Sequence, residues 1–128
     1  MTRKLFLALA ISLSFFGATT GMAQTGAGIQ NRGHAPTRPD GIGRLDLRVS
    51  DAQGQPIKGA QAKLSSERSG GFFCETWNSS DANGVAVLPP LHVGKLKLVV
   101  KASGYRTQTI ELAPNALAQP VRVTLARA

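Results

Sequence analysis

The sequence has few of the residues that cross-link or enlarge a small fold. It contains one cysteine, Cys74, which has no second thiol to pair with inside the chain. Aromatic residues make up 5% of the chain, with one Trp and one Tyr. A domain built from this sequence must therefore be held together by aliphatic side chains. The 128 residues are enough for one such domain and too few for two.

Acidic residues are also scarce, with 7 against 15 basic ones. If Arg3 and Lys4 are removed with an N-terminal leader, 13 basic and 7 acidic side chains are left, a net charge of +6. A protein of this charge is attracted to anionic surfaces such as polysaccharide, lipid headgroups or nucleic acid. The alternative is that the charge serves solubility alone.

Long apolar runs are absent apart from one at the start of the chain. Met1-Thr2-Arg3-Lys4 is followed by an apolar run from Leu5 to Phe16 and by Gly21-Met22-Ala23. This pattern predicts a signal peptide over 1–23, cleaved after Ala23. The run is short of the roughly 20 residues that span a bilayer, although an uncleaved membrane anchor is the alternative. No cysteine follows the run, so we expect no lipid anchor.

Cleavage there would place the mature protein in the periplasm or outside the cell, with no stable membrane insertion. Export also argues against nucleic acid as a partner. Residues 24–43 are rich in Gly and Pro, have few apolar side chains and show no periodicity. Such a segment buries too little surface to order itself, which predicts a flexible linker.

From Arg44 onward the apolar residues recur with a period of two, which is typical of half-buried strands. Between the runs lie turn formers, the clearest being Asp81-Ala82-Asn83-Gly84. We therefore expect an all-β domain over 44–128, a sandwich without a significant helix. The seven expected strands are 44–49, 60–64, 72–77, 85–88, 95–102, 105–112 and 121–125.

The turns, taken in order, resemble those of the carboxypeptidase regulatory-like domains of bacterial envelope proteins. The resemblance is carried by the segments at 49–60, 80–84, 91–94 and 100–105, and it covers residues 44–126. It implies a transthyretin-like, seven-stranded Greek-key β-sandwich without catalysis of its own. The same fold also houses a purine-breakdown hydrolase with a Tyr-Arg-Gly-Ser ending. This chain ends Leu125-Ala126-Arg127-Ala128, so that activity is not expected.

Candidate catalytic and metal-binding residues are few. Cys74 and His92 are the one candidate nucleophile–base pair, and Cys74 lies in an expected strand with no positive helix end to lower its pKa. A small core residue is the better interpretation. Asp81 and Asn83 resemble the start of a calcium loop whose distal Glu is missing. His34 and His92 are too far apart to indicate zinc. We expect no catalytic residue, metal or cofactor.

The strand around Cys74 carries the first candidate binding surface. Phe72, Cys74 and Thr76 share one face, and Phe73, Glu75 and Trp77 share the other. If charged Glu75 faces water, Phe73 and Trp77 are exposed with it and offer a platform for sugar rings or an apolar partner. The alternative is a bulged strand that buries Trp77 as a core anchor.

Lysines form the second candidate surface. Lys95, Lys97 and Lys101 lie on one side of an expected strand, and outward positions are also expected for Arg48, Lys63 and Arg122. Together these cations predict an anion-binding surface, and ordinary solvated charge that discourages edge pairing is the alternative.

These observations favour a non-catalytic binding module of the cell envelope, whose partner is an anionic envelope polymer or an envelope protein. Two other hypotheses stay open. The first is a structural subunit that adds an edge strand to another chain. The second is a small secreted thiol enzyme, which lacks a catalytic constellation.

Overall fold

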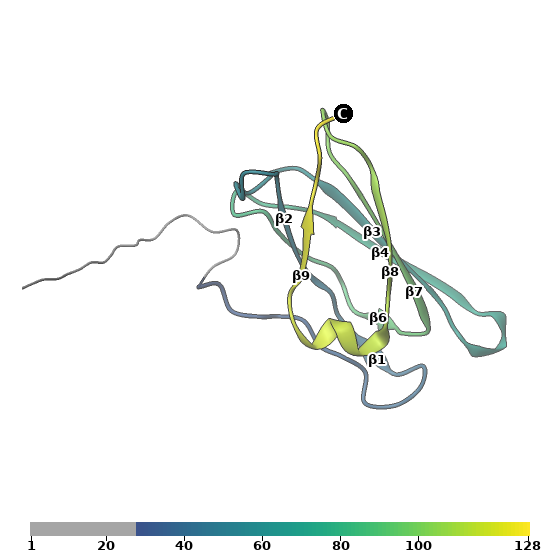
Figure 1. The fold of residues 1–128 in the computed structure, drawn as a ribbon. Coiled ribbons are helices and arrows are strands. Elements are labelled where there is room, and N and C mark those ends of the chain that lie inside the picture. The colour runs from purple at the N-terminus through teal and green to yellow at the C-terminus, as the bar shows by residue number, and fades with distance from the viewer. Residues whose placement is uncertain (1–27) are drawn as a thin grey trace, which may run out of the picture.

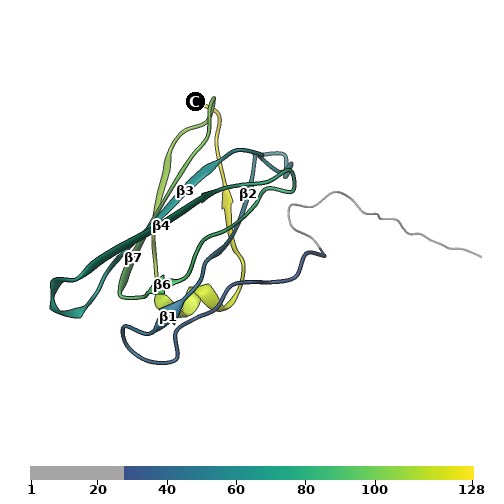
Figure 2. The same cartoon turned by 180° about the vertical axis from the view of Figure 1, so that it is seen from behind.

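The chain folds into two packed β-sheets that form a Greek-key β-sandwich (Figures 1 and 2). A computed structural model describes residues 28–128. The expected signal peptide over 1–23, and the first residues of the expected linker, lie outside the described residues. Within residues 28–128, no helix has the length and apolar character needed to cross a membrane.

The smaller sheet has three strands in the order β5-β2-β9, and the larger has four in the order β4-β3-β7-β8. Strand β2 is central in the smaller sheet, antiparallel to β5 and parallel to β9. The chain changes sheet between β2 and β3, between β4 and β5, between β5 and β7, and between β8 and β9. The bounds are β2 Asp46–Ser50, β3 Gln61–Glu67, β4 Phe73–Ser79, β5 Val85–Val87, β7 Lys95–Lys101, β8 Gln108–Leu112 and β9 Val121–Thr124.

The core lies between the two sheets and is built from the alternate residues that the period of two predicts. It is almost entirely aliphatic, since among residues 28–128 the aromatic side chains other than half-buried Tyr105 stay outside it. Burial of this apolar surface is the main stabilising term in a fold without a disulfide. The buried strand residues include Leu47, Val49, Ala62, Leu64, Leu96, Leu98, Val100 and Val123.

Two turns repeat one local design. Asp51 Oδ1 accepts hydrogen bonds from the main-chain N–H groups of Gln53 and Gln55, and Asp81 Oδ1 does the same for Asn83 and Val85. Each turn ends on a glycine with a positive φ, 81° at Gly54 and 76° at Gly84, where a side chain would be strained. The segment 81–84, which resembles the start of a calcium loop, is therefore a turn.

All seven expected strands are present, with ends shifted by a few residues. The largest shifts are of three residues: β3 extends to Glu67, and β8 begins at Gln108, after Tyr105 has formed a bridge with Arg127. Two short strands were not expected, β1 (Ile42–Gly43) and β6 (Leu91–His92), which pair with each other. The short 3-10 helices Ser69–Gly71 and Pro114–Ala118 complete the described structure.

The expectation of a flexible linker over 24–43 is wrong for residues 29–43, which we call the N-terminal arm. This arm lies along the sandwich through main-chain and side-chain hydrogen bonds. Gly43 shows how closely it packs, since a Cβ there would lie 2.8 Å from Val93 Cγ2. The arm buries few apolar side chains, which is why its composition did not reveal the packing.

Candidate functional site

The solvent side of the four-stranded sheet, which we call the outer face, carries the aromatic and basic residues singled out above. Strand register arranges its side chains in rows that run across β4, β3, β7 and β8. The rows are Phe73–Glu67–Lys95, Glu75–Ser65–Lys97–Glu111, Trp77–Lys63–Val99–Thr109 and Ser79–Gln61–Lys101.

Trp77 and Phe73 both point to solvent on this face. Their exposed fractions are 66% and 62%, whereas Thr76 between them is 5% exposed and points into the sandwich. Trp77 is therefore not a buried core anchor. Its indole lies beside Lys63, its cross-strand neighbour on β3. A large apolar side chain held in water on a rigid strand is a feature of binding surfaces.

The three lysines of the expected anion-binding surface do share the outer face, but they do not stand there alone. Lys95 is opposite Glu67, and Lys97 is opposite Glu111. Lys63 lies 3.7 Å from Glu75, measured from Nζ to Oε2. Of the three lysines, only Lys101 has no carboxylate in its row. The outer face is therefore nearly charge-balanced, because register places an acid beside most of its cations.

Two hollows occupy the outer face on either side of Lys63 and Val99. One, of about 600 Å³, is bordered by Trp77, Ser79, Gln61 and Lys101. The other, of about 450 Å³, is bordered by Phe73, Glu75, Lys95 and Lys97. Both volumes lie in the range of small-molecule sites, and only the first contains the indole.

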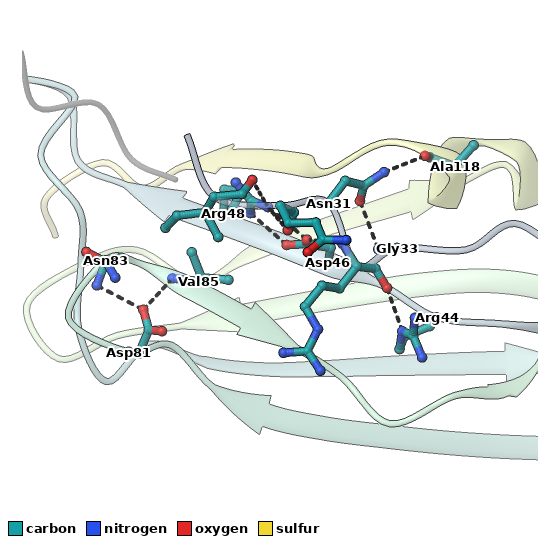
Figure 3. A network of polar contacts seen from close by, with 12 residues as sticks. Asn31, Gly33, Arg44, Asp46, Arg48, Asp81, Asn83, Val85 and Ala118 are labelled. Atoms are coloured by element: carbon teal, nitrogen blue, oxygen red, sulfur yellow. Dashed lines mark hydrogen bonds and ion pairs between the residues drawn. The ribbon is translucent and has the colours of Figure 1, made fainter. Parts of the chain in front are cut away.

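The other side of the molecule holds a feature that the sequence did not suggest. Arg48 was expected on the water-facing side of its strand, yet Arg48 and its neighbour on that side, Asp46, are 1% and 0% exposed. They point away from the core, and the N-terminal arm covers them, so the expectation of an outward Arg48 is wrong. Figure 3 shows the pair side by side with the arm residues around it.

This pair is joined by two hydrogen bonds. Arg48 Nε donates to Asp46 Oδ1 at 2.7 Å, and Nη2 donates to Oδ2 at 2.8 Å. The arm adds the N–H of Arg32, which donates to Asp46 Oδ2 at 2.8 Å, and the carbonyl of Gln30, which accepts from Arg48 at 3.3 Å. Asn31 anchors the arm further by donating to the carbonyl of Ala118 (Figure 3).

The pKa values of the pair follow from these contacts. Burial alone would raise the pKa of Asp46, but the hydrogen bonds from Arg48 and from the Arg32 N–H, together with the nearby positive charges, lower it from 3.8. Hydrogen bonding to Asp46 raises the pKa of Arg48 above its ordinary value, against the opposing effect of burial. Both groups are therefore charged at neutral pH, and each is the other's main partner.

We expect acid to destabilise the domain through Asp46. A carboxyl with a lowered folded-state pKa binds fewer protons folded than unfolded, so its contribution is complete above 3.8 and is lost as pH falls through the folded value. The free energy of unfolding, measured by urea titration between neutral pH and about pH 3, should therefore fall steeply at the acid end. Asp46→Asn should flatten that slope, and an unchanged slope would contradict this assignment.

Cys74 and His92, the candidate nucleophile–base pair, lie on different strands, β4 and β6. Cys74 is half-buried, lies opposite Ser66 and packs against the core, where a small core residue was expected. His92 is exposed, and its Nδ1 lies 3.0 Å from the carbonyl oxygen of Asp40. Among residues 28–128, no group of three or more His, Cys, Asp or Glu side chains is placed to hold a metal ion.

A third hollow of about 750 Å³ lies where the arm runs beside the ends of β4 and β5. Trp77 borders it as well as the first hollow on the outer face, and two arginines that the sequence analysis had not singled out, Arg32 and Arg44, border it from the arm side. No sequence signal marked these arginines, because Arg32 lies in the expected linker and Arg44 begins the expected strand 44–49.

Comparison with known proteins gives a family match for the sequence and a structural likeness for the fold. The profile described as the carboxypeptidase regulatory-like domain matches residues 44–126. No curated protein sequence matches the chain. Among solved structures, the chain is similar to 3-chlorocatechol 1,2-dioxygenase from Rhodococcus opacus 1CP, with a TM-score of 0.51, 14% identity, and 74% of this chain and 65% of that chain covered. A streptococcal ancillary pilin gives a TM-score of 0.49 and 14% identity, with 98% of this chain and 33% of the pilin covered.

The chain thus spans just under two thirds of the dioxygenase chain and a third of the pilin. At this identity the dioxygenase shows a shared β-sandwich and nothing about chemistry.

Proposed function

Because the chain belongs to the carboxypeptidase regulatory-like domain family, a family of non-catalytic modules, we propose that it is an exported binding module of the bacterial cell envelope. Export is proposed from the leader pattern of residues 1–23, which would deliver the mature chain to the periplasm or the medium. Intact-mass analysis of the protein from an envelope or medium fraction tests this, with Gln24 as the expected first residue.

The proposed ligand is an anionic polysaccharide of the envelope, and the proposed contact is the outer face around Trp77. The exposed indole on a rigid strand is the observation that carries the proposal. A sugar ring presents a flat face of C–H groups that packs against an aromatic ring, and the hollow beside Trp77 has room for it. The basic residues around it, including Lys95, Lys97 and Lys101, would add long-range attraction.

We expect Trp77→Ala to weaken binding of an acidic oligosaccharide roughly tenfold at every salt concentration, because apolar contact is not screened by ions. The triple variant Lys95→Ala/Lys97→Ala/Lys101→Ala should weaken binding mainly at low salt, because its contribution is diffuse charge. Isothermal titration at low and high salt separates the two effects.

Phe72→Ala provides the matched control, since Phe72 is as exposed as Trp77 but borders neither hollow beside the indole. It should leave the affinity unchanged. Binding that survives Trp77→Ala, or that responds equally to Phe72→Ala, would refute the assignment of the site.

A second candidate is a structural subunit that associates through the free edge of β4. The bonds Ser80 N–H to Ala60 O and Arg68 N–H to Phe72 O set the phase of the β3–β4 ladder, so the main-chain groups of Phe73, Glu75 and Trp77 face away from β3. Strand β4 contains no Lys or Pro to protect this edge. A molecular mass in solution above that of one chain, lost on Glu75→Pro, would favour this candidate.

A further inference from the structure

The groove between the N-terminal arm and the ends of β4 and β5 has the composition of a site for an acidic sugar. Arg32 and Arg44 border it on the arm side, Trp77 and Asn78 on the β4 side, and Pro89 beyond β5. It shares Trp77 with the hollow on the outer face, so one indole serves both. The only carboxylate on its border is that of Asp81.

The two arginines are held in place by the arm. The main chain of Arg32 is fixed at both groups, since its N–H donates to the buried carboxylate of Asp46 and its carbonyl accepts from Arg44 Nε. Within residues 28–128, no hydrogen bond or ion pair occupies the Arg32 guanidinium. The buried Asp46–Arg48 pair therefore positions an arginine whose own side chain is available to a ligand.

Charge distinguishes this groove from the outer face. On the outer face, Lys63, Lys95 and Lys97 each lie next to a glutamate. In the groove, two guanidiniums stand against Asp81, whose Oδ1 already accepts the N–H groups of Asn83 and Val85 at 2.9 and 3.0 Å. An incoming carboxylate therefore finds cations here that are less compensated than the lysines.

From this geometry we infer that the groove binds the uronate units of the proposed polysaccharide, with Arg32 and Arg44 holding sugar carboxylates while a neighbouring ring lies on Trp77. The inference rests on the proposed function and names its ligand as a carboxylated glycan. A guanidinium offers a planar pair of N–H donors that matches a carboxylate, which an ammonium group does not. The arginines supply the specific contact, and the lysines supply diffuse attraction.

The experiment uses a galacturonic acid hexasaccharide and its fully methyl-esterified form as probes. The full mature chain is compared with Arg32→Ala, which removes the guanidinium but keeps both main-chain hydrogen bonds of residue 32, and with Lys97→Ala as the matched loss of one exposed cation. Arg32→Ala should weaken binding of the acid form about tenfold or more. Lys97→Ala should weaken it less than about twofold at the same ionic strength. Neither variant should change binding of the ester, which has no carboxylate to hold.

Arg32→Lys tests whether the planar pair of N–H donors is needed, because it keeps the charge and loses the pair. It should recover less than half of the binding free energy that Arg32→Ala loses. Equal unfolding midpoints for the parent chain and Arg32→Ala serve as the folding check. If Lys97→Ala costs as much as Arg32→Ala, the inference is overturned while the proposed function stands. If the ester binds as well as the acid, the carboxylate contact is overturned. If neither form binds the parent chain, the proposed function itself fails.

Discussion

Replacing Arg48 with Ala should destabilise the domain by about 3–5 kcal/mol, because it leaves a buried carboxylate without its partner. Asp46 is 0% exposed, and Arg48 gives it two hydrogen bonds at 2.7 and 2.8 Å. With the guanidinium gone, the N–H of Arg32 is the one hydrogen-bond donor left to the carboxylate among residues 28–128. A loss of this size is a large part of the stability of a small domain. Urea unfolding of the variant and the parent chain measures it.

A double variant separates the effect of losing the whole ion pair from the effect of leaving one charge unpaired. Asp46→Leu/Arg48→Met removes both charges while roughly keeping volume, and it should be much less destabilising than Arg48→Ala alone. Arg48→Lys should fall between the two, since it keeps the charge but loses the paired hydrogen bonds. If Arg48→Ala costs less than about 1 kcal/mol, as an exposed substitution would, the pair is not buried as described.

Removing the N-terminal arm through Arg32 should also be strongly destabilising, by about 2–3 kcal/mol. The truncation deletes the Arg32 N–H that bonds the buried carboxylate, the Gln30 carbonyl that accepts from Arg48, and the link from Asn31 to Ala118. Hydrogen bonds to charged groups are worth more than neutral ones, so the loss falls mainly on the Asp46–Arg48 pair. Thermal and urea unfolding of a chain that starts at Gly33 measure it.

A chain that starts at Gly28 keeps all these contacts and is the matched control, with which the unfolding midpoint of the shorter chain is compared. A chain starting at Gly33 that is as stable as this control would show that the arm is not part of the folded domain. The same truncation should remove the groove beside Trp77 and lower affinity for the uronate hexasaccharide.

The strands could be predicted because each has one face in the core and one in water. Along β7, for example, Leu96, Leu98 and Val100 alternate with residues that stay outside the core. Strand β2 does not follow this pattern, because its second face is covered by the N-terminal arm. Asp46 and Arg48 have the spacing of water-facing residues, and a period of two cannot distinguish water from a covering segment that meets them with hydrogen bonds. The arm itself is attached mainly through polar groups, which leave no hydrophobic pattern.

The candidate site was predictable in part for a similar reason. Glu75 and Trp77 are two residues apart on β4 and therefore point to the same face of the sheet. The charge of Glu75 thus indicated the face that the indole takes, and that face is exposed. The alternation of residues along one strand does not show which residues lie opposite on the neighbouring strands. The glutamates opposite Lys95 and Lys97 were therefore not foreseen. The approach of Arg32 and Arg44 to Trp77 depends on the path of the arm, which no local pattern in the sequence encodes.

Quenching of Trp77 fluorescence tests the central claim most directly, because Trp77 is the single tryptophan of the chain. An indole that is 66% exposed should emit as a solvated indole and be quenched readily by acrylamide in the folded protein. Adding the galacturonic acid hexasaccharide should shift the emission and protect the indole from quenching, and the neutral ester should do so less. A shielded indole in the free protein, or an exposed one that no acidic oligosaccharide perturbs, would contradict the account.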